Sequence, residues 1–497
     1  MAEAITSDAA VRKVLLGGSF YTGLAEAVAI VSGLATSLVA ARVLSPRDFG
    51  LMATATLALS VLDHFSQSGF DAALVQRQDD VESYLDVAWT WQLLRGLVIT
   101  LLLFAVALPM SRFYGEAVLL PLVMASALSS TIAGAANVGR IFFARKLDFR
   151  TLFFINAAQA GLKLAVFLPA VLILRNVWAL VVGHLGGALL SLAISYIAHP
   201  YRPKLAFDRG KLRELLRFGK WVTMFAWIGF FITKGDDIFV SKYIGVAALG
   251  FYQLAYDISN LPTTKVTHVI GRIGLPIYAR LVHDRELLRA TFLKVMRATL
   301  LASALVSTAI YIAVPDIIAY VLGSKWAPVI PLVRILVAAG FVRSFVALAG
   351  PLYQANGRPE LDFWMNFPRF VVTVVLIWPF CALYGLEGAS WVVLLAVATC
   401  IPMWLRETRN LIALSWRRAL QELLLAAGTS ASLALCLLTA RALVPDTALG
   451  ALAGLLGGLG AWLLADLALG ALTSVGVVVE IRRLLAAVRA QRSSVPA

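Results

Sequence analysis

The chain carries charged side chains within a stretch that is long and apolar enough to cross a membrane. Residues 220–246 read KWVTMFAWIGFFITKGDDIFVSKYIGV, with Lys234, Asp236 and Asp237 near the middle. A charge at the centre of a bilayer costs at least about 2.5–3.5 kcal/mol, so such residues usually face a water-filled cavity or a charged partner. Lys234 and Asp237 are three residues apart on one helical face and are expected to neutralise each other in part. We predict Lys234 as a substrate contact and the two aspartates as ion-coupling groups.

Among the other basic residues inside or beside apolar stretches, four are candidates for binding an anion: Arg95, Lys163, Arg272 and Arg343. An arginine offers forked hydrogen bonds to a phosphate, and a lysine offers a compact charge. We therefore predict all four as substrate-binding residues that contact an anion in a cavity. The alternatives are an ion pair inside the helix bundle or an aliphatic stem whose charged end reaches water. Arg272, close to the end of its stretch, also fits a topology anchor.

Carboxylates in apolar stretches are the second kind of candidate. We predict that five of them bind the proton or other cation that drives transport: Glu26, Asp63, Asp236, Asp237 and Asp257. The alternative is that they pair with other side chains for structural reasons. The sequence contains no GxxxxGK[ST] phosphate loop, no HExxH or GxSxG motif and no His/Cys cluster. We therefore predict no metal, no cofactor, no built-in ATPase and no enzymatic activity.

The elements that must position these residues are membrane-spanning helices. Apolar residues make up 60% of the 497 residues and charged residues 14%, against about 45–50% and about 25% in soluble domains. Period-two alternation is absent. We predict an all-α polytopic membrane protein of about 14 transmembrane helices. The apolar windows of about 20 residues, the length that crosses a bilayer, are 15–41, 50–69, 84–108, 117–139, 152–174, 177–198, 218–243, 248–271, 296–314, 331–353, 363–384, 386–405, 419–440 and 447–475.

The net charge of +15 follows from membrane topology. If the N-terminus is cytoplasmic, most lysines and arginines fall in cytoplasmic loops, which is the positive-inside pattern. We therefore predict a multi-pass membrane protein with both termini cytoplasmic, whose partner is the lipid bilayer and which binds no nucleic acid. Residues 479–497 are predicted to form a basic amphipathic tail on the inner leaflet.

An internal repeat relates the two halves of the chain. AARVLSPRDFGLM, from Ala40, matches VSKYIGVAALGFY, from Val240, and RKLDFR matches PELDFW around Leu-Asp-Phe. Six helices per copy make the repeat parallel. We predict an N-lobe of helices 1–6 (residues 1–200), a C-lobe of helices 7–12 (201–405) and two appended helices (406–478), followed by the tail.

Several motifs resemble those of one family. VLSPRDFGLMATATLALSVLDHFSQSGFDAALVQRQD, followed by WTWQLLRG, is similar to the first lobe of bacterial polysaccharide flippases of the O-antigen and exopolysaccharide type. FFARKLDFR, GDDIFVSKYIGVAALGFYQLAYDISNLP, LGSKWAPVIPLVRIL and YQANGRPELDF resemble later segments of that family. The family belongs to the multidrug/oligosaccharidyl-lipid/polysaccharide exporter superfamily.

The resemblance implies two six-helix lobes in a V, with the last two helices beside them. It also implies alternating-access transport of undecaprenyl-pyrophosphate-linked oligosaccharide units from the cytoplasmic to the periplasmic leaflet, for lipopolysaccharide (O-antigen) or exopolysaccharide biosynthesis. A glycan polymerase and chain-length machinery are the protein partners it suggests. Cationic cavity residues are a property of the family, which suits Arg95, Lys163 and Arg343.

Three other functions would require different features of the sequence. A multidrug or cation exporter of the same fold would have a cavity with net negative charge. A membrane glycan polymerase or ligase needs a reaction centre on the outer side, where the loops here are short and poor in charge. A structural or scaffolding protein does not explain charges inside apolar helices.

Overall fold

The computed structural model describes residues 8–66, 82–145, 148–210, 230, 233–260, 274–275 and 277–473. Within these ranges the regular structure is helical and contains no strand. Nine segments of the described chain are long and apolar enough to cross a membrane, and α5 (Leu119–Gly134) is a shorter apolar helix. The protein is therefore a multi-pass, all-α membrane protein, as the sequence predicted. The count of about 14 helices stays a prediction.

Contacts divide the chain into two compact units, Met1–Gln253 and Leu254–Ala497. The predicted lobe boundaries at residues 200 and 405 mark a different division and stay predictions. The main helices of unit 1, in chain order, are α1 (Asp8–Val43), α2 (Pro46–Phe65), α4 (Glu82–Tyr114), α5, α7 (Phe149–Leu174) and α8 (Val177–Ala198).

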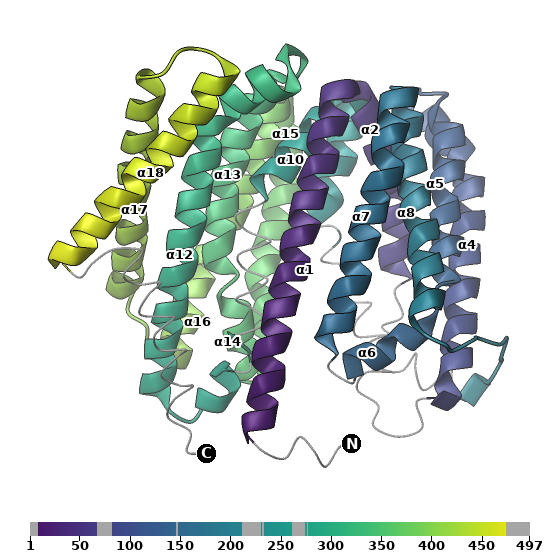
Figure 1. Ribbon diagram of the computed structural model, residues 1–497, viewed down its shortest axis with the longest axis horizontal. Coiled ribbons are helices and arrows are strands. Elements are labelled where there is room, and N and C mark those ends of the chain that lie inside the picture. Colours follow the sequence, from purple (N-terminus) through teal and green to yellow (C-terminus); the bar gives the residue numbers. More distant parts are fainter. Residues whose placement is uncertain are drawn as a thin grey trace. The chain divides into compact units, whose positions relative to one another are not determined.

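Local sequence signals explain where several helices of unit 1 begin. Ser45 precedes α2, and its side chain accepts a hydrogen bond from the Asp48 N–H while the Asp48 carboxylate accepts one from the Ser45 N–H. This capping box satisfies two backbone donors that the helix leaves unpaired. Asp148 and Asn176 cap α7 and α8 in the simpler one-sided way. Inside unit 1, α4 packs beside α5 and α7 beside α8 (Figure 1), while α5 also contacts α2 and α8.

Unit 2 contains the last residues of α10, from Leu254, and the helices that follow it. Their bounds are α10 (Val246–Ser259), α12 (Arg285–Asp316), α13 (Val329–Val346), α14 (Ala349–Ala355), α15 (Glu360–Ala398), α16 (Cys400–Ile412), α17 (Trp416–Ala442) and α18 (Ala448–Thr473). The first residues of α10 count with unit 1. Helix α12 packs against α13 and α17, and α17 lies beside α18. The core includes Phe345 and Trp404, whose ring centroids are 4.1 Å apart.

A kink at Gly385 divides α15 into two helices. Gly385 has φ 57° and ψ −133°, outside the helical region, and a positive φ of this kind favours glycine because it has no Cβ. The sequence windows 363–384 and 386–405 were separated at this same residue. The predicted boundary between two apolar spans is therefore confirmed as a backbone break.

The two copies of the first repeat motif meet in unit 1. Helix α2 begins at Pro46, and α10 begins at Val246 after a π-helical turn, Val240–Ile244, and Gly245. A Cβ added to Gly50 would overlap the carbonyl group of Val246, and one added to Gly250 would overlap the carbonyl group of Pro46. Equivalent residues of the two copies thus make equivalent contacts, which supports the internal repeat and explains why both positions are glycine.

Candidate functional site

A polar cavity of about 220 Å³ lies inside unit 1, between α2, α4 and α5. Its polar lining side chains are Ser60, Asp63, His64, Gln92, Arg95, Ser129 and Ser130. A cavity with this lining, inside helices that are otherwise apolar, is the kind of place where a charged group can stay hydrated or bind a polar ligand.

Arg95 and Asp63 form an ion pair in this cavity. The Arg95 Nη2 bonds the Asp63 carboxylate and donates to the Asp63 backbone oxygen at 3.2 Å, and Nε donates to Ser66 Oγ at 3.0 Å. The side chains are 21% and 47% exposed. The sequence named Arg95 as a substrate contact and Asp63 as an ion-coupling group, and the structure brings the two together.

A second polar link adjoins the cavity. Ser129 lines the cavity from α5, and its Oγ lies 3.0 Å from Nε2 of His184 on α8. Lys163, on α7, is exposed, and its aliphatic stem lies beside Gly187 on α8. The link between Ser129 and His184 was not anticipated, because a serine in an apolar helix gives no local signal of a partner 55 residues away.

The acidic pair of the 220–246 stretch is buried, and both carboxylates accept hydrogen bonds. Asp236 and Asp237 are each 3% exposed. Lys234 Nζ lies 2.8 Å from Asp237 Oδ2, which confirms the pairing that the i,i+3 spacing predicted. Tyr252 donates to Asp236 and Gln253 to Asp237, both at 2.7 Å. These two partners from α10 were missed, because they are 16 residues further along the chain.

The other predicted site residues are dispersed. Arg343, on α13, donates to Asn260 Oδ1 at 2.7 Å, and its guanidinium lies 5.8 Å from the Tyr256 ring centroid. Asp257 lies exposed on α10. Arg272 falls outside the described residues, and so does the side chain of Glu26, although the backbone of residue 26 belongs to α1.

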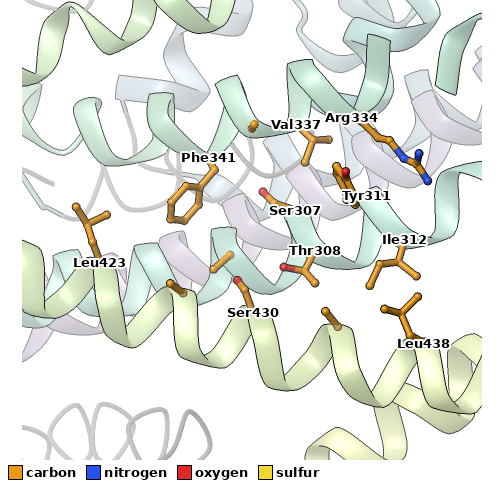
Figure 2. A pocket seen from close by; sticks show the side chains of 14 residues that line it. Ser307, Thr308, Tyr311, Ile312, Arg334, Val337, Phe341, Leu423, Ser430 and Leu438 are labelled. Carbon is orange, nitrogen blue, oxygen red and sulfur yellow. The ribbon is translucent and has the colours of Figure 1, made fainter. Parts of the chain in front are cut away.

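Unit 2 contains a larger cavity of about 510 Å³ between α12, α13 and α17 (Figure 2). Its walls are mainly apolar. Arg334 and Tyr311 lie together near one end, with the guanidinium 5.0 Å from the ring centroid. The Arg334 Nε is buried and has no hydrogen-bond partner among the described residues, and the same is true of Ser307 Oγ. Arg334 was not among the predicted site residues, although an arginine within an apolar window was the available signal.

Two ion pairs join α12 to α17. One lies beyond each end of the cavity in the direction of the helix axes. Arg297 Nε and Nη2 each lie 2.7 Å from a carboxylate oxygen of Glu422. Arg441 makes a similar forked contact with Asp316, at 3.0 and 3.1 Å. The cavity-lining residues of both helices lie between these pairs in sequence. The pairs therefore fix how α12 and α17 run beside each other.

Comparisons with known proteins agree on one group. A family model described as polysaccharide biosynthesis protein matches residues 39–331. The lipopolysaccharide biosynthesis protein WzxC of Escherichia coli (strain K12) is 24% identical over 373 residues, covering 74% of this chain and 75% of that protein. The succinoglycan biosynthesis transport protein ExoT of Rhizobium meliloti (strain 1021) is 26% identical over 382 residues, covering 72% of this chain and 76% of that protein.

A solved structure has the same fold. The lipid II flippase MurJ, in an inward closed conformation, aligns with a TM-score of 0.70 at 13% sequence identity, over 92% of this chain and 99% of that chain. At this level of identity the likeness concerns the fold.

Proposed function

Since this chain belongs to the polysaccharide biosynthesis protein family, we propose that it is a flippase for lipid-linked oligosaccharides. It moves undecaprenyl-pyrophosphate-linked units from the cytoplasmic to the periplasmic leaflet of the bacterial inner membrane, for surface polysaccharide biosynthesis. The observation that carries the proposal at the site is the partly exposed Arg95, paired with Asp63 in a polar cavity inside an apolar helical unit. The similarity to WzxC and ExoT supports it.

The physical task fits such a molecule. A pyrophosphate and a sugar chain cannot cross hydrocarbon unaided, because each desolvated polar group costs several kcal/mol. A protein cavity supplies water and cationic partners, while the polyprenyl tail stays in lipid. Rocking of one repeat against the other then exposes the site to each side in turn. This is transport without a covalent step, so no enzymatic activity is required.

The substrate contacts follow from charge. We assign Arg95, Lys163, Lys234, Arg272 and Arg343 to the pyrophosphate or to anionic sugars. Arg95 has the best support, because its Nη1 group makes no hydrogen bond with described residues and its cavity is polar. In unit 2, the combination of Arg334 and apolar walls suits an amphipathic anion rather than a free sugar.

The carboxylates are assigned to coupling. Glu26, Asp63, Asp236, Asp237 and Asp257 are proposed to bind the proton or cation whose gradient drives transport. The lobes at residues 1–200 and 201–405, the appended helices at 406–478, the cytoplasmic termini and the 479–497 tail complete the proposed architecture. A glycan polymerase and chain-length machinery are the proposed protein partners.

The first test is removal of the gene from its bacterium, followed by analysis of lipid-linked intermediates and surface glycan. We expect loss of the glycan and accumulation of a polyprenyl-linked unit accessible from the cytoplasm, both reversed by the wild-type gene. Unchanged glycan with altered resistance to cationic drugs would favour the multidrug exporter instead. Loss of polymerisation with normal translocation would favour a polymerase.

The second test concerns the site. Arg95→Ala and Lys163→Ala are expected to impair glycan export while the amount of protein in the membrane stays normal. Arg175→Ala, at the exposed end of α7, is the matched control and should export normally. Normal export by both site variants would refute the assignment of these residues to the substrate.

A further inference from the structure

The Arg95–Asp63 pair raises the question of how a phosphate would reach Arg95. The carboxylate of Asp63 bonds Nη2, and Nε bonds Ser66, so two of the three guanidinium nitrogens are already engaged. Arginine prefers forked, two-point contacts with phosphate. A forked contact of a phosphate with Nη1 and Nη2 therefore competes with the Asp63 carboxylate for the N–H groups of Nη2.

The structure leaves room for the Asp63 side chain to move away from Arg95. Its side chain is 47% exposed and borders a cavity of about 220 Å³, far more than the roughly 30 Å³ that one water takes in the liquid. The same cavity offers Gln92, Ser129 and Ser130 as further polar contacts for an incoming phosphate. The remaining titratable group in the lining is His64, whose Nδ1 lies 2.9 Å from the Ser60 backbone oxygen.

We propose that Asp63 is an internal competitor for Arg95: it neutralises the guanidinium in the empty protein, and the substrate phosphate displaces it. The inference rests on the proposed function, since it takes Arg95 as a phosphate contact. Asp63 thus imitates the anion that the site transports. A site that is neutral when empty avoids leaving an unpaired charge inside the apolar bundle while the protein returns for another substrate.

The competition predicts that removing Asp63 tightens binding. The probe is undecaprenyl pyrophosphate, titrated into the full-length protein in lipid nanodiscs, with undecaprenol as the probe that lacks phosphate. We expect Asp63→Asn to lower the Kd for undecaprenyl pyrophosphate at least about tenfold, which corresponds to about 1.4 kcal/mol. Binding of undecaprenol should not change.

A double-mutant cycle separates competition from a general structural effect. Arg95→Gln should weaken binding of the pyrophosphate, and Asp63→Asn should have no further effect in the Arg95→Gln background. The matched control is Glu116→Gln, which breaks the exposed Arg47–Glu116 pair of the same unit, at 2.6 Å, and should leave the Kd unchanged. Asp63→Ser provides a second uncharged variant if the asparagine variant does not elute as a single species.

The outcomes distinguish this inference from the function on which it rests. If the wild-type protein binds undecaprenyl pyrophosphate no better than undecaprenol, the proposed function is wrong at this site. If the wild type prefers the pyrophosphate but a folded Asp63 variant binds it equally or more weakly, the competition is wrong. Tighter binding that persists without Arg95 would also overturn it, because the effect would not pass through the guanidinium.

Discussion

Replacing Gly50 with alanine tests the close crossing of α2 and the start of α10. The added Cβ would lie 2.6 Å from the carbonyl carbon of Val246, and the carbonyl oxygen would be closer still. Contacts of a Cβ below 3.0 Å are essentially never found. The obstacle is backbone, which cannot rotate aside as a side chain does. The helices must therefore move apart by roughly 1 Å in a region packed as densely as a crystal.

The magnitude follows from two opposing terms. Alanine gains about 1 kcal/mol over glycine in helix propensity, whereas overpacking a dense core costs about 1–3 kcal/mol, occasionally more. Because the obstacle is main chain, we take the upper end of this cost, about 3 kcal/mol. Subtracting the gain in helix propensity leaves an expected decrease of about 2 kcal/mol in the free energy of unfolding. Gly250→Ala should behave alike, since its Cβ would lie 2.9 Å from the carbonyl carbon of Pro46. The double variant should lose less than the sum, because one displacement relieves both clashes.

The assay is thermal unfolding of the purified protein in detergent, followed by the loss of monodisperse protein. The matched control is Gly161→Ala, at a helical position of α7 where an added Cβ meets nothing within 4 Å. That variant should melt at or slightly above the wild-type temperature. If Gly50→Ala has the same melting temperature as Gly161→Ala, the close approach of α2 and the start of α10 is incorrect.

Three further changes can be followed by the same melting assay. Arg297→Gln leaves the Glu422 carboxylate, which is 9% exposed, without its forked partner and should lower the free energy of unfolding by about 2–3 kcal/mol. The double variant R297M/E422L should recover most of this loss. No recovery would contradict the pairing. Tyr252→Phe removes the hydroxyl that bonds a buried carboxylate and should cost about 1–3 kcal/mol; a wild-type melting temperature would argue against that bond. Asp148→Ala removes the N-cap of α7 and should cost about 1 kcal/mol. The hydroxyl and backbone N–H of Thr151 lower the pKa of Asp148. The Asp148 cap should therefore stabilise the protein fully above the usual carboxyl pKa and lose this effect as the pH falls through the lowered pKa. A stability difference between wild type and Asp148→Ala that stays constant down to about pH 2 would contradict this.

Much of the fold was predictable because membrane helices are specified by local composition. An apolar window long enough to cross the bilayer must be helical, since lipid offers no partner to unpaired backbone groups. Glycine at residue 385 separated two windows and proved to be a backbone break. The pairing of Lys234 with Asp237 followed from helical spacing alone.

The candidate site was predictable only as a set of separate residues. A charge in an apolar window marks a position that needs a partner or water, which is how Arg95 and Asp63 were each found. Nothing in either window indicates that the two side chains meet, because they lie 32 residues apart on different helices. The same holds for Arg297 and Glu422, which are 125 residues apart.

The sequence by itself therefore determined that this protein is a helical membrane protein, where several helices begin and break, and which charges are out of place in lipid. Those properties depend on hydrophobicity and on backbone hydrogen bonding within a few turns of chain. Tertiary structure alone decided which charges pair, which polar groups share a cavity and which glycines are required by a helix crossing. These depend on how each helix is rotated about its axis, and packing against all its neighbours sets that rotation.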